Sequence, residues 1–66
     1  MSVIPYEDVI RKMIDTFDRN KVDLRTMDPE KRKAFYVIAD RIDDACNNDD
    51  RKAFNIAIME CRDLLL

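Results

Sequence analysis

The chain has 66 residues, with 12 basic and 14 acidic side chains, a formal net charge of −2, and neither histidine nor glycine. This charge gives no general attraction to nucleic acid or anionic lipid, and the lack of glycine argues against strand turns and phosphate-binding loops, which need backbone with positive φ. We therefore expect an all-α fold. The chain is long enough for a single domain with a small core, because a chain of this length hides only about 60% of the surface that its unfolded form exposes.

A first helix is predicted from about Pro5 to Arg19. Its apolar residues recur at helical spacing and form one stripe, while charged residues occupy the opposite side. Proline suits the first turn of a helix, and the carboxylates of Glu7 and Asp8 complement the helix dipole there. The apolar stripe, which we expect to face the core, consists of Tyr6, Val9, Ile10, Met13, Ile14 and Phe17.

A second helix is predicted from residue 29 to about residue 46, after a connection at residues 20–28 that lacks helical periodicity. Its start is marked by a capping carboxylate at Asp28, a proline at the first helical position and an acid in the first turn, Glu30. This helix is also amphipathic. Its predicted core stripe consists of Phe35, Ile38, Ala39, Ile42 and Cys46.

The sequence DDACNNDD separates the second helix from the third. It is rich in acids, but no register supplies the alternating oxygen ligands, the sixth-place glycine and the twelfth-place glutamate of a calcium loop. We interpret residues 47–49 as a turn in which Asn47 or Asn48 takes the left-handed conformation that ends the second helix. Asn48, Asp49 or Asp50 then caps the third helix, and weak cation binding stays an alternative role for the acids.

A third helix is predicted from about Asp50 to Leu65. The tetrapeptide RKAF occurs in both the second and the third helix, at residues 32–35 and 51–54, and it aligns their apolar stripes. We therefore expect these two helices to form an antiparallel hairpin, with the first helix packed on it, in a small three-helix bundle. In this alignment the core stripe of the third helix consists of Phe54, Ala57, Ile58, Cys61 and Leu65.

Five apolar residues of the hairpin occupy sides of the helices where water is expected. On the third helix Ile56 lies roughly opposite the core stripe, and Met59 and Leu66 lie beside it. Val37 occupies the equivalent position to Ile56 on the second helix, with Tyr36 a further step round. Isolated exposed residues, or cover by another helix, would explain these positions, and a binding surface is the alternative interpretation.

The sequence contains few groups that could carry catalysis. Both thiols, Cys46 and Cys61, lie on predicted core stripes, where burial raises the pKa of a thiol. In an antiparallel hairpin they are offset by roughly 15 Å, which is too far for a disulfide, and without histidine they make a poor metal site. We therefore expect no catalytic residue, no metal and no cofactor. With two cysteines and no apolar run of the roughly 18 residues that a membrane span needs, we expect a cytoplasmic protein without a membrane or small-molecule partner.

The function that we expect is that of a small regulator, adaptor or inhibitor that binds another protein, or a second copy of itself as a homodimer. The expected binding face consists of Tyr36, Val37, Ile56, Met59 and Leu66, with Lys52 and Arg62 at its rim. The alternative is a DNA-binding protein that resembles a helix-turn-helix and reads DNA with its third helix. The DNA-reading residues would then be Arg51, Lys52, Asn55 and Arg62. The acidic balance of the chain weighs against this alternative.

Overall fold

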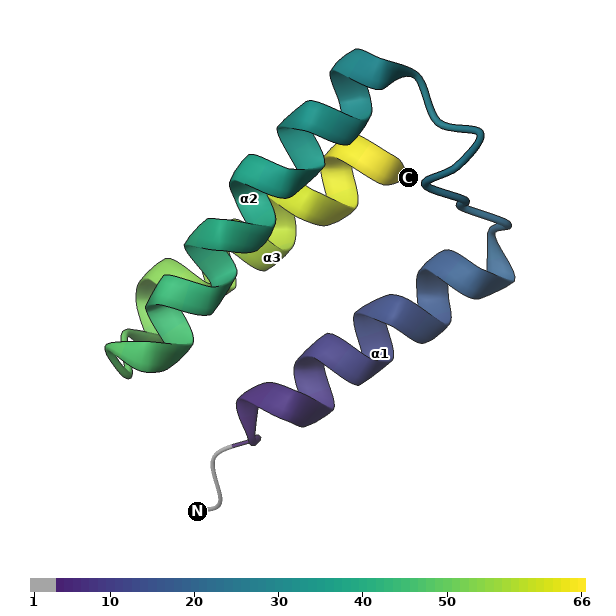
Figure 1. Ribbon diagram of the computed structural model, residues 1–66. Coiled ribbons are helices and arrows are strands. Elements are labelled where there is room, and N and C mark those ends of the chain that lie inside the picture. The colour runs from purple at the N-terminus through teal and green to yellow at the C-terminus, as the bar shows by residue number, and fades with distance from the viewer. Residues whose placement is uncertain (1–3) are drawn as a thin grey trace.

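The computed structural model describes residues 4–66, which fold into three helices without any strand (Figure 1). Helix α1 spans Tyr6–Arg19, α2 spans Pro29–Asn47 and α3 spans Arg51–Leu65. Each bound lies within one residue of the position expected from the sequence. The prediction of an all-α fold is confirmed, and no helix in the described part of the chain is long and apolar enough to cross a bilayer.

Side-chain caps start α2 and α3. The Asp28 carboxylate accepts a hydrogen bond from the backbone N–H of Glu30 at 3.1 Å. The Asp50 carboxylate accepts one from the backbone N–H of Ala53, also at 3.1 Å. Each cap satisfies a donor of the first helical turn, which has no partner inside the helix.

Helix α1 ends in a Schellman motif although the chain has no glycine. Lys21 takes the left-handed conformation, with φ of 58°. The N–H of Lys21 donates to the carbonyl of Asp18 at 3.1 Å, and the N–H of Val22 donates to the carbonyl of Phe17 at 2.9 Å. Val22 packs against the core to which Phe17 belongs, which is the apolar contact that accompanies this motif. The turn after α1 is therefore well bonded but carries strain at a residue with a Cβ atom.

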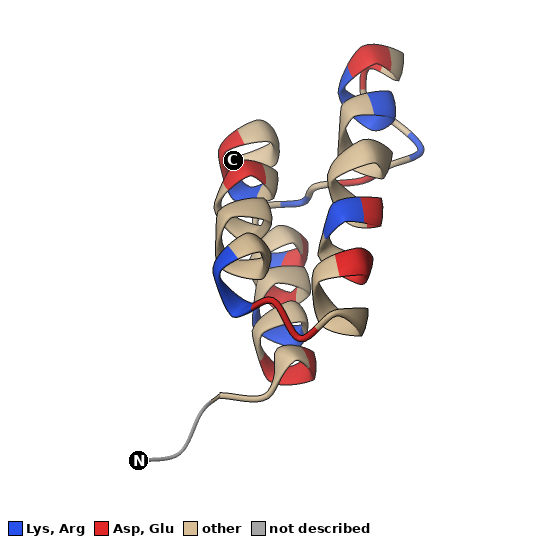
Figure 2. Cartoon of the chain, turned by 90° about the vertical axis from the view of Figure 1, so that its left-hand side faces the viewer, with Lys and Arg blue, Asp and Glu red and all other residues tan. Residues whose placement is uncertain are grey.

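Helix α2 ends in the same way at Asp49, which has φ of 52°. The N–H of Asp50 donates to the carbonyl of Ala45 at 2.9 Å. The prediction that Asn47 or Asn48 takes the left-handed conformation is wrong, because α2 continues through Asn47 and Asn48 is its C-cap, with φ of −93°. The motif requires the left-handed residue one position after the C-cap. Figure 2 shows this acidic turn between the two helices of the hairpin.

The connection between α1 and α2 is held by Arg32, near the start of α2. Its guanidinium donates to the carbonyl of Leu24 at 2.9 Å and to that of Met27 at 3.2 Å. Arg32 is half-buried under this segment. The arginine therefore satisfies two carbonyls of a segment that has no helix of its own.

The core lies mainly between α2 and α3, which pack side by side along their length (Figure 1). Phe54 and Cys61 of α3 are fully buried. Ala45 and Ala57 are buried as well, and such small side chains let the axes of two helices approach closely. The buried residues are Met13, Phe17, Ile38, Ile42, Ala45, Phe54, Ala57, Ile58 and Cys61.

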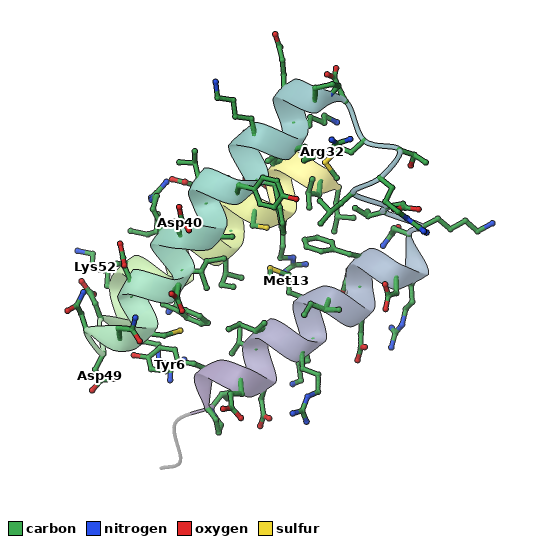
Figure 3. All side chains as sticks on the ribbon, viewed as in Figure 1. Tyr6, Met13, Arg32, Asp40, Asp49 and Lys52 are labelled. Carbon is green, nitrogen blue, oxygen red and sulfur yellow. The ribbon has the colours of Figure 1, made fainter. Side chains whose placement is uncertain are left out.

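Helix α1 packs mainly against α3 and only weakly against α2. The ring of Tyr6 meets that of Phe54 edge-on, with 4.7 Å between the centroids, and Met13 points from α1 toward the hairpin (Figure 3). The prediction that Ile14 faces the core is wrong, because this side chain is 49% exposed. Ile14 lies about 100° further round α1 than Met13, on the side toward α2. A groove separates α1 from α2 on this side.

Replacement of Lys21 tests the strain at the end of α1. Lys21→Gly should be more stable than Lys21→Ala by about 1 kcal/mol, because both variants lose the lysine side chain but only glycine takes the left-handed conformation without a steric penalty. Denaturant unfolding followed by circular dichroism gives the two free energies. Equal free energies of unfolding would contradict the left-handed conformation of this residue.

Candidate protein-interaction surface

All five apolar residues that we predicted on the outside of the hairpin are exposed. Their exposed fractions run from 44% for Ile56 to 64% for Met59. Lys52 and Arg62, which we expected at the rim, are exposed too. The structure distributes the five residues over different sides of the hairpin, so they do not form one continuous face.

Three of the five residues lie along the outer side of α3. Ile56 and Met59 are neighbours one turn apart, and Leu66 follows Met59 two turns later. Met59 and Leu66 line one shallow hollow together with Arg62 and Asp63. We name Ile56, Met59 and Leu66 the α3 strip. The strip points away from α1 and α2, because the buried residues of α3 occupy the opposite side of the helix.

Val37 lies near the junction of α2 and α3. It precedes Arg41 by one turn, and the Arg41 guanidinium forms an ion pair with the carboxylate of Glu60 on α3. Glu60 follows Ile56 by one turn. Because the helices are antiparallel, Val37 and Ile56 lie on the same side of the hairpin, with the ion pair between them. The α3 strip therefore does not continue directly into Val37.

Tyr36 lies on a different side of α2 from Val37. Successive side chains of a helix differ in direction by about 100°, so these two point apart. The ring centroid of Tyr36 lies 5.8 Å from that of Phe35, and Phe35 lines a groove between α1 and α2. Tyr36 therefore lies next to a residue of this groove without lining the groove itself, and it is not part of the α3 strip.

The apolar groove between α1 and α2 has a volume of about 280 Å³. Its walls include Ile10, Ile14 and Phe17 on α1 and Phe35, Ala39 and Cys46 on α2. Sequence reasoning missed the groove because it assigned both stripes to the core. The width of the apolar stripe on α1 could have indicated the groove. Val9 and Ile14 point about 140° apart, which is too wide an angle for one neighbouring helix to cover.

Arg51, one of the residues of the DNA-binding alternative, is held against α1. Its guanidinium stacks over the ring of Tyr6, 4.1 Å from the centroid, and donates to the carbonyl of Ile4 at 2.6 Å. The Tyr6 hydroxyl donates to the carboxylate of Asp49 at 2.8 Å, so α1, the turn and α3 meet at one end of the molecule (Figure 3). The other residues of this set are exposed, namely Lys52, Asn55 and Arg62.

The two thiols are free and differ in exposure, since Cys61 is buried and Cys46 is half-buried. Burial raises the pKa of both thiols, and the negative charge of Asp43 raises the pKa of Cys46 further. Both thiols are therefore protonated near neutral pH, which makes them weak nucleophiles.

The acids of the turn do not gather into a metal site, because no group of three or more His, Cys, Asp or Glu side chains within residues 4–66 could hold an ion. No known protein family, curated protein or solved structure matches the chain. The candidate site is therefore defined by the exposure and grouping of the residues of this chain.

The pKa of Tyr6 reports on the contact between α1 and the turn. The hydrogen bond to Asp49 raises this pKa above its ordinary value of 10.0, as do desolvation and the negative charge of Asp49. In a Tyr36→Phe chain, Tyr6 is the single tyrosine, and its ionisation followed by ultraviolet absorbance should occur above pH 10.0. Asp49→Asn in this chain should lower the pKa, because it removes the negative charge that the phenolate would face.

The raised pKa of Tyr6 also sets the direction of the pH dependence of stability. The contribution of a group whose pKa is raised on folding is present below its ordinary value, here 10.0, and is lost as pH rises through the raised pKa. Denaturant unfolding of the Tyr36→Phe chain should show this alkaline loss, and addition of Tyr6→Phe should remove it. An ionisation of Tyr6 that Asp49→Asn leaves unchanged would contradict the contact.

Proposed function

We propose that the chain is a small protein-binding module without catalytic activity of its own, and that the α3 strip contacts the partner protein. The observation that carries the proposal is the exposure of three large apolar side chains along one side of α3, with Met59 at 64%. Single exposed apolar residues are common on soluble proteins. A row of them on one helix is the pattern by which a helix binds an apolar groove of another protein.

Burial of the α3 strip against a partner is energetically favourable. Complete burial of an Ile, Leu or Met side chain contributes about 1.5–3 kcal/mol, so three half-exposed side chains offer roughly 2–5 kcal/mol in total. A micromolar complex needs about 8 kcal/mol, so residues around the strip must contribute as well. Lys52 and Arg62 are exposed beside it and can pair with carboxylates of the partner. We expect a partner with an apolar groove bordered by acids.

The two exposed apolar residues of α2 differ in their distance from the α3 strip. Val37 lies across the Arg41–Glu60 ion pair from the strip, where a larger partner can reach it. Tyr36 lies beside the groove between α1 and α2, next to Phe35. The partner surface that we propose is therefore centred on α3 and leaves Tyr36 out.

The alternative of DNA binding by α3 has less support. Arg51 is stacked on Tyr6 and bonded to the carbonyl of Ile4, so its guanidinium is not free to read a base. In a helix-turn-helix the two helices cross at about 90–120°, whereas α2 and α3 lie antiparallel along their length (Figure 1). The acidic turn at the start of α3 would also face the phosphates of DNA (Figure 2). We therefore favour a protein partner.

Affinity capture with a matched pair of variants tests the proposal. Met59→Asp places a charge in the α3 strip, and Ile14→Asp makes the same kind of change at an exposed apolar residue outside it. Both variants should keep the circular dichroism of a helical protein, since both side chains are about half exposed or more. Met59→Asp should recover its partner from an extract of the native cells about tenfold less than the unmodified chain, which corresponds to about 1.4 kcal/mol.

The control variant should recover the partner as well as the unmodified chain does. Equal recovery by Met59→Asp and the unmodified chain would contradict the assignment of the partner surface to the α3 strip. Loss of the partner in Ile14→Asp alone would contradict it as well, and would place the partner at the groove.

A further inference from the structure

The groove between α1 and α2 is an apolar feature that the proposed function leaves unused. Ile14 at its edge is 49% exposed, and Asp43 is the one charged residue among those that line it. Small-molecule sites usually have about 300–1,000 Å³ and several polar groups that orient the ligand, whereas this groove has about 280 Å³ and a single carboxylate. Its shape and lining therefore suit the apolar side chains of another polypeptide.

The charged residues beside Ile14 indicate which polypeptide fits. Glu7 and Lys21 lie seven residues before and seven residues after Ile14, while Arg11 and Asp18 lie closer to it on either side. All four charged residues are exposed, and none forms an ion pair within residues 4–66. On the Ile14 side of α1 the charges therefore run negative, positive, then Ile14, then negative, and the positive Lys21 follows in the turn that ends the helix.

When two copies of this segment lie antiparallel, the charges of one copy are opposite in sign to those of the other. If two copies of α1 lie antiparallel and cross at Ile14, Arg11 faces Asp18 of the second copy. Glu7 then lies beside the turn that holds Lys21 of the second copy. A twofold axis repeats each of these contacts, so each of these four charges meets an opposite one. A parallel arrangement would place each charge against its own equivalent, and such like-charge contacts are unfavourable.

We propose that the chain forms a homodimer about a twofold axis at Ile14, in which the α1 helices lie antiparallel and each Ile14 enters the groove of the other copy. The proposal goes beyond the protein-binding function and does not depend on it. The α3 strip lies outside this interface, because its residues point away from α1 and α2. The dimer also covers apolar surface that a chain of 66 residues is too short to bury alone.

Sedimentation equilibrium over a concentration series tests for the dimer. The unmodified chain should show a mass near twice 7.8 kDa at about 100 μM, a concentration at which a micromolar dimer is almost fully formed. Ile14→Asp should show 7.8 kDa at the same concentration, because it would bring a charge into the apolar groove. Met59→Asp, the matched change outside the interface, should keep the dimer.

Charge reversal tests the antiparallel pairing. Glu7→Lys alone and Lys21→Glu alone should each raise the Kd of the dimer about tenfold, because the twofold axis places two repulsive contacts in each dimer. An equimolar mixture of the two variants should form a heterodimer with a Kd near that of the unmodified chain, because a lysine then faces a glutamate in both contacts. Lys12→Glu reverses an exposed charge that points about 160° away from Ile14 round α1, and it should leave the Kd unchanged.

Each other outcome overturns the proposal. Monomers at every concentration would show that a second copy does not occupy the groove. A dimer that survives Ile14→Asp, or that Met59→Asp disrupts in its place, would assign self-association to another surface. A dimer that Ile14→Asp disrupts, but whose charge variants show no recovery on mixing, would rule out the antiparallel pairing of α1.

Discussion

The close packing of α2 against α3 is the constraint on which the rest of the structure depends. Phe54 and Cys61 of α3 are fully buried, and the buried alanines Ala45 and Ala57 let the axes of α2 and α3 approach. The tight turn at the end of α2 makes the hairpin antiparallel, and this arrangement decides which side of α3 faces water. Helix α1 has no interface as extensive as the one between α2 and α3. It packs mainly against α3, where the ring of Tyr6 contacts that of Phe54.

The position of α1 has a direct consequence for the surface of the molecule. Helix α1 packs mainly against α3, and a groove separates it from α2. The hairpin therefore covers only one side of the apolar stripe of α1. Two separate apolar surfaces result: the α3 strip on the outside of the hairpin, and the groove beside Ile14 between α1 and α2. Since they face different directions, the dimer that we propose at the groove leaves the α3 strip free for the protein partner that we propose. In that case, association would stabilise a chain with so small a core.

The helices and their hairpin could be predicted from the sequence because they depend on local signals, namely capping residues and apolar spacing. The same spacing correctly placed Ile56 in contact with water. The position of α1 could not be predicted, because periodicity shows which side of a helix is apolar but not which neighbour covers it, and Ile14 was wrongly assigned to the core. The left-handed residue was wrongly predicted, because the preference of asparagine for this conformation favoured Asn47 or Asn48, whereas the hydrogen bonds of the motif select Asp49.

The groove and the α3 strip should respond differently to protein concentration, because only the groove is covered by a second copy in the dimer that we propose. Backbone amide NMR spectra of the isotope-labelled chain, recorded on serial dilution, measure this response residue by residue. We predict that dilution shifts the amide signals around Ile14 on α1 and Ala39 on α2, while those around Ile56 and Met59 stay in place. Shifts concentrated on the α3 strip, or no shift anywhere across the dilution series, would contradict this division between the two surfaces.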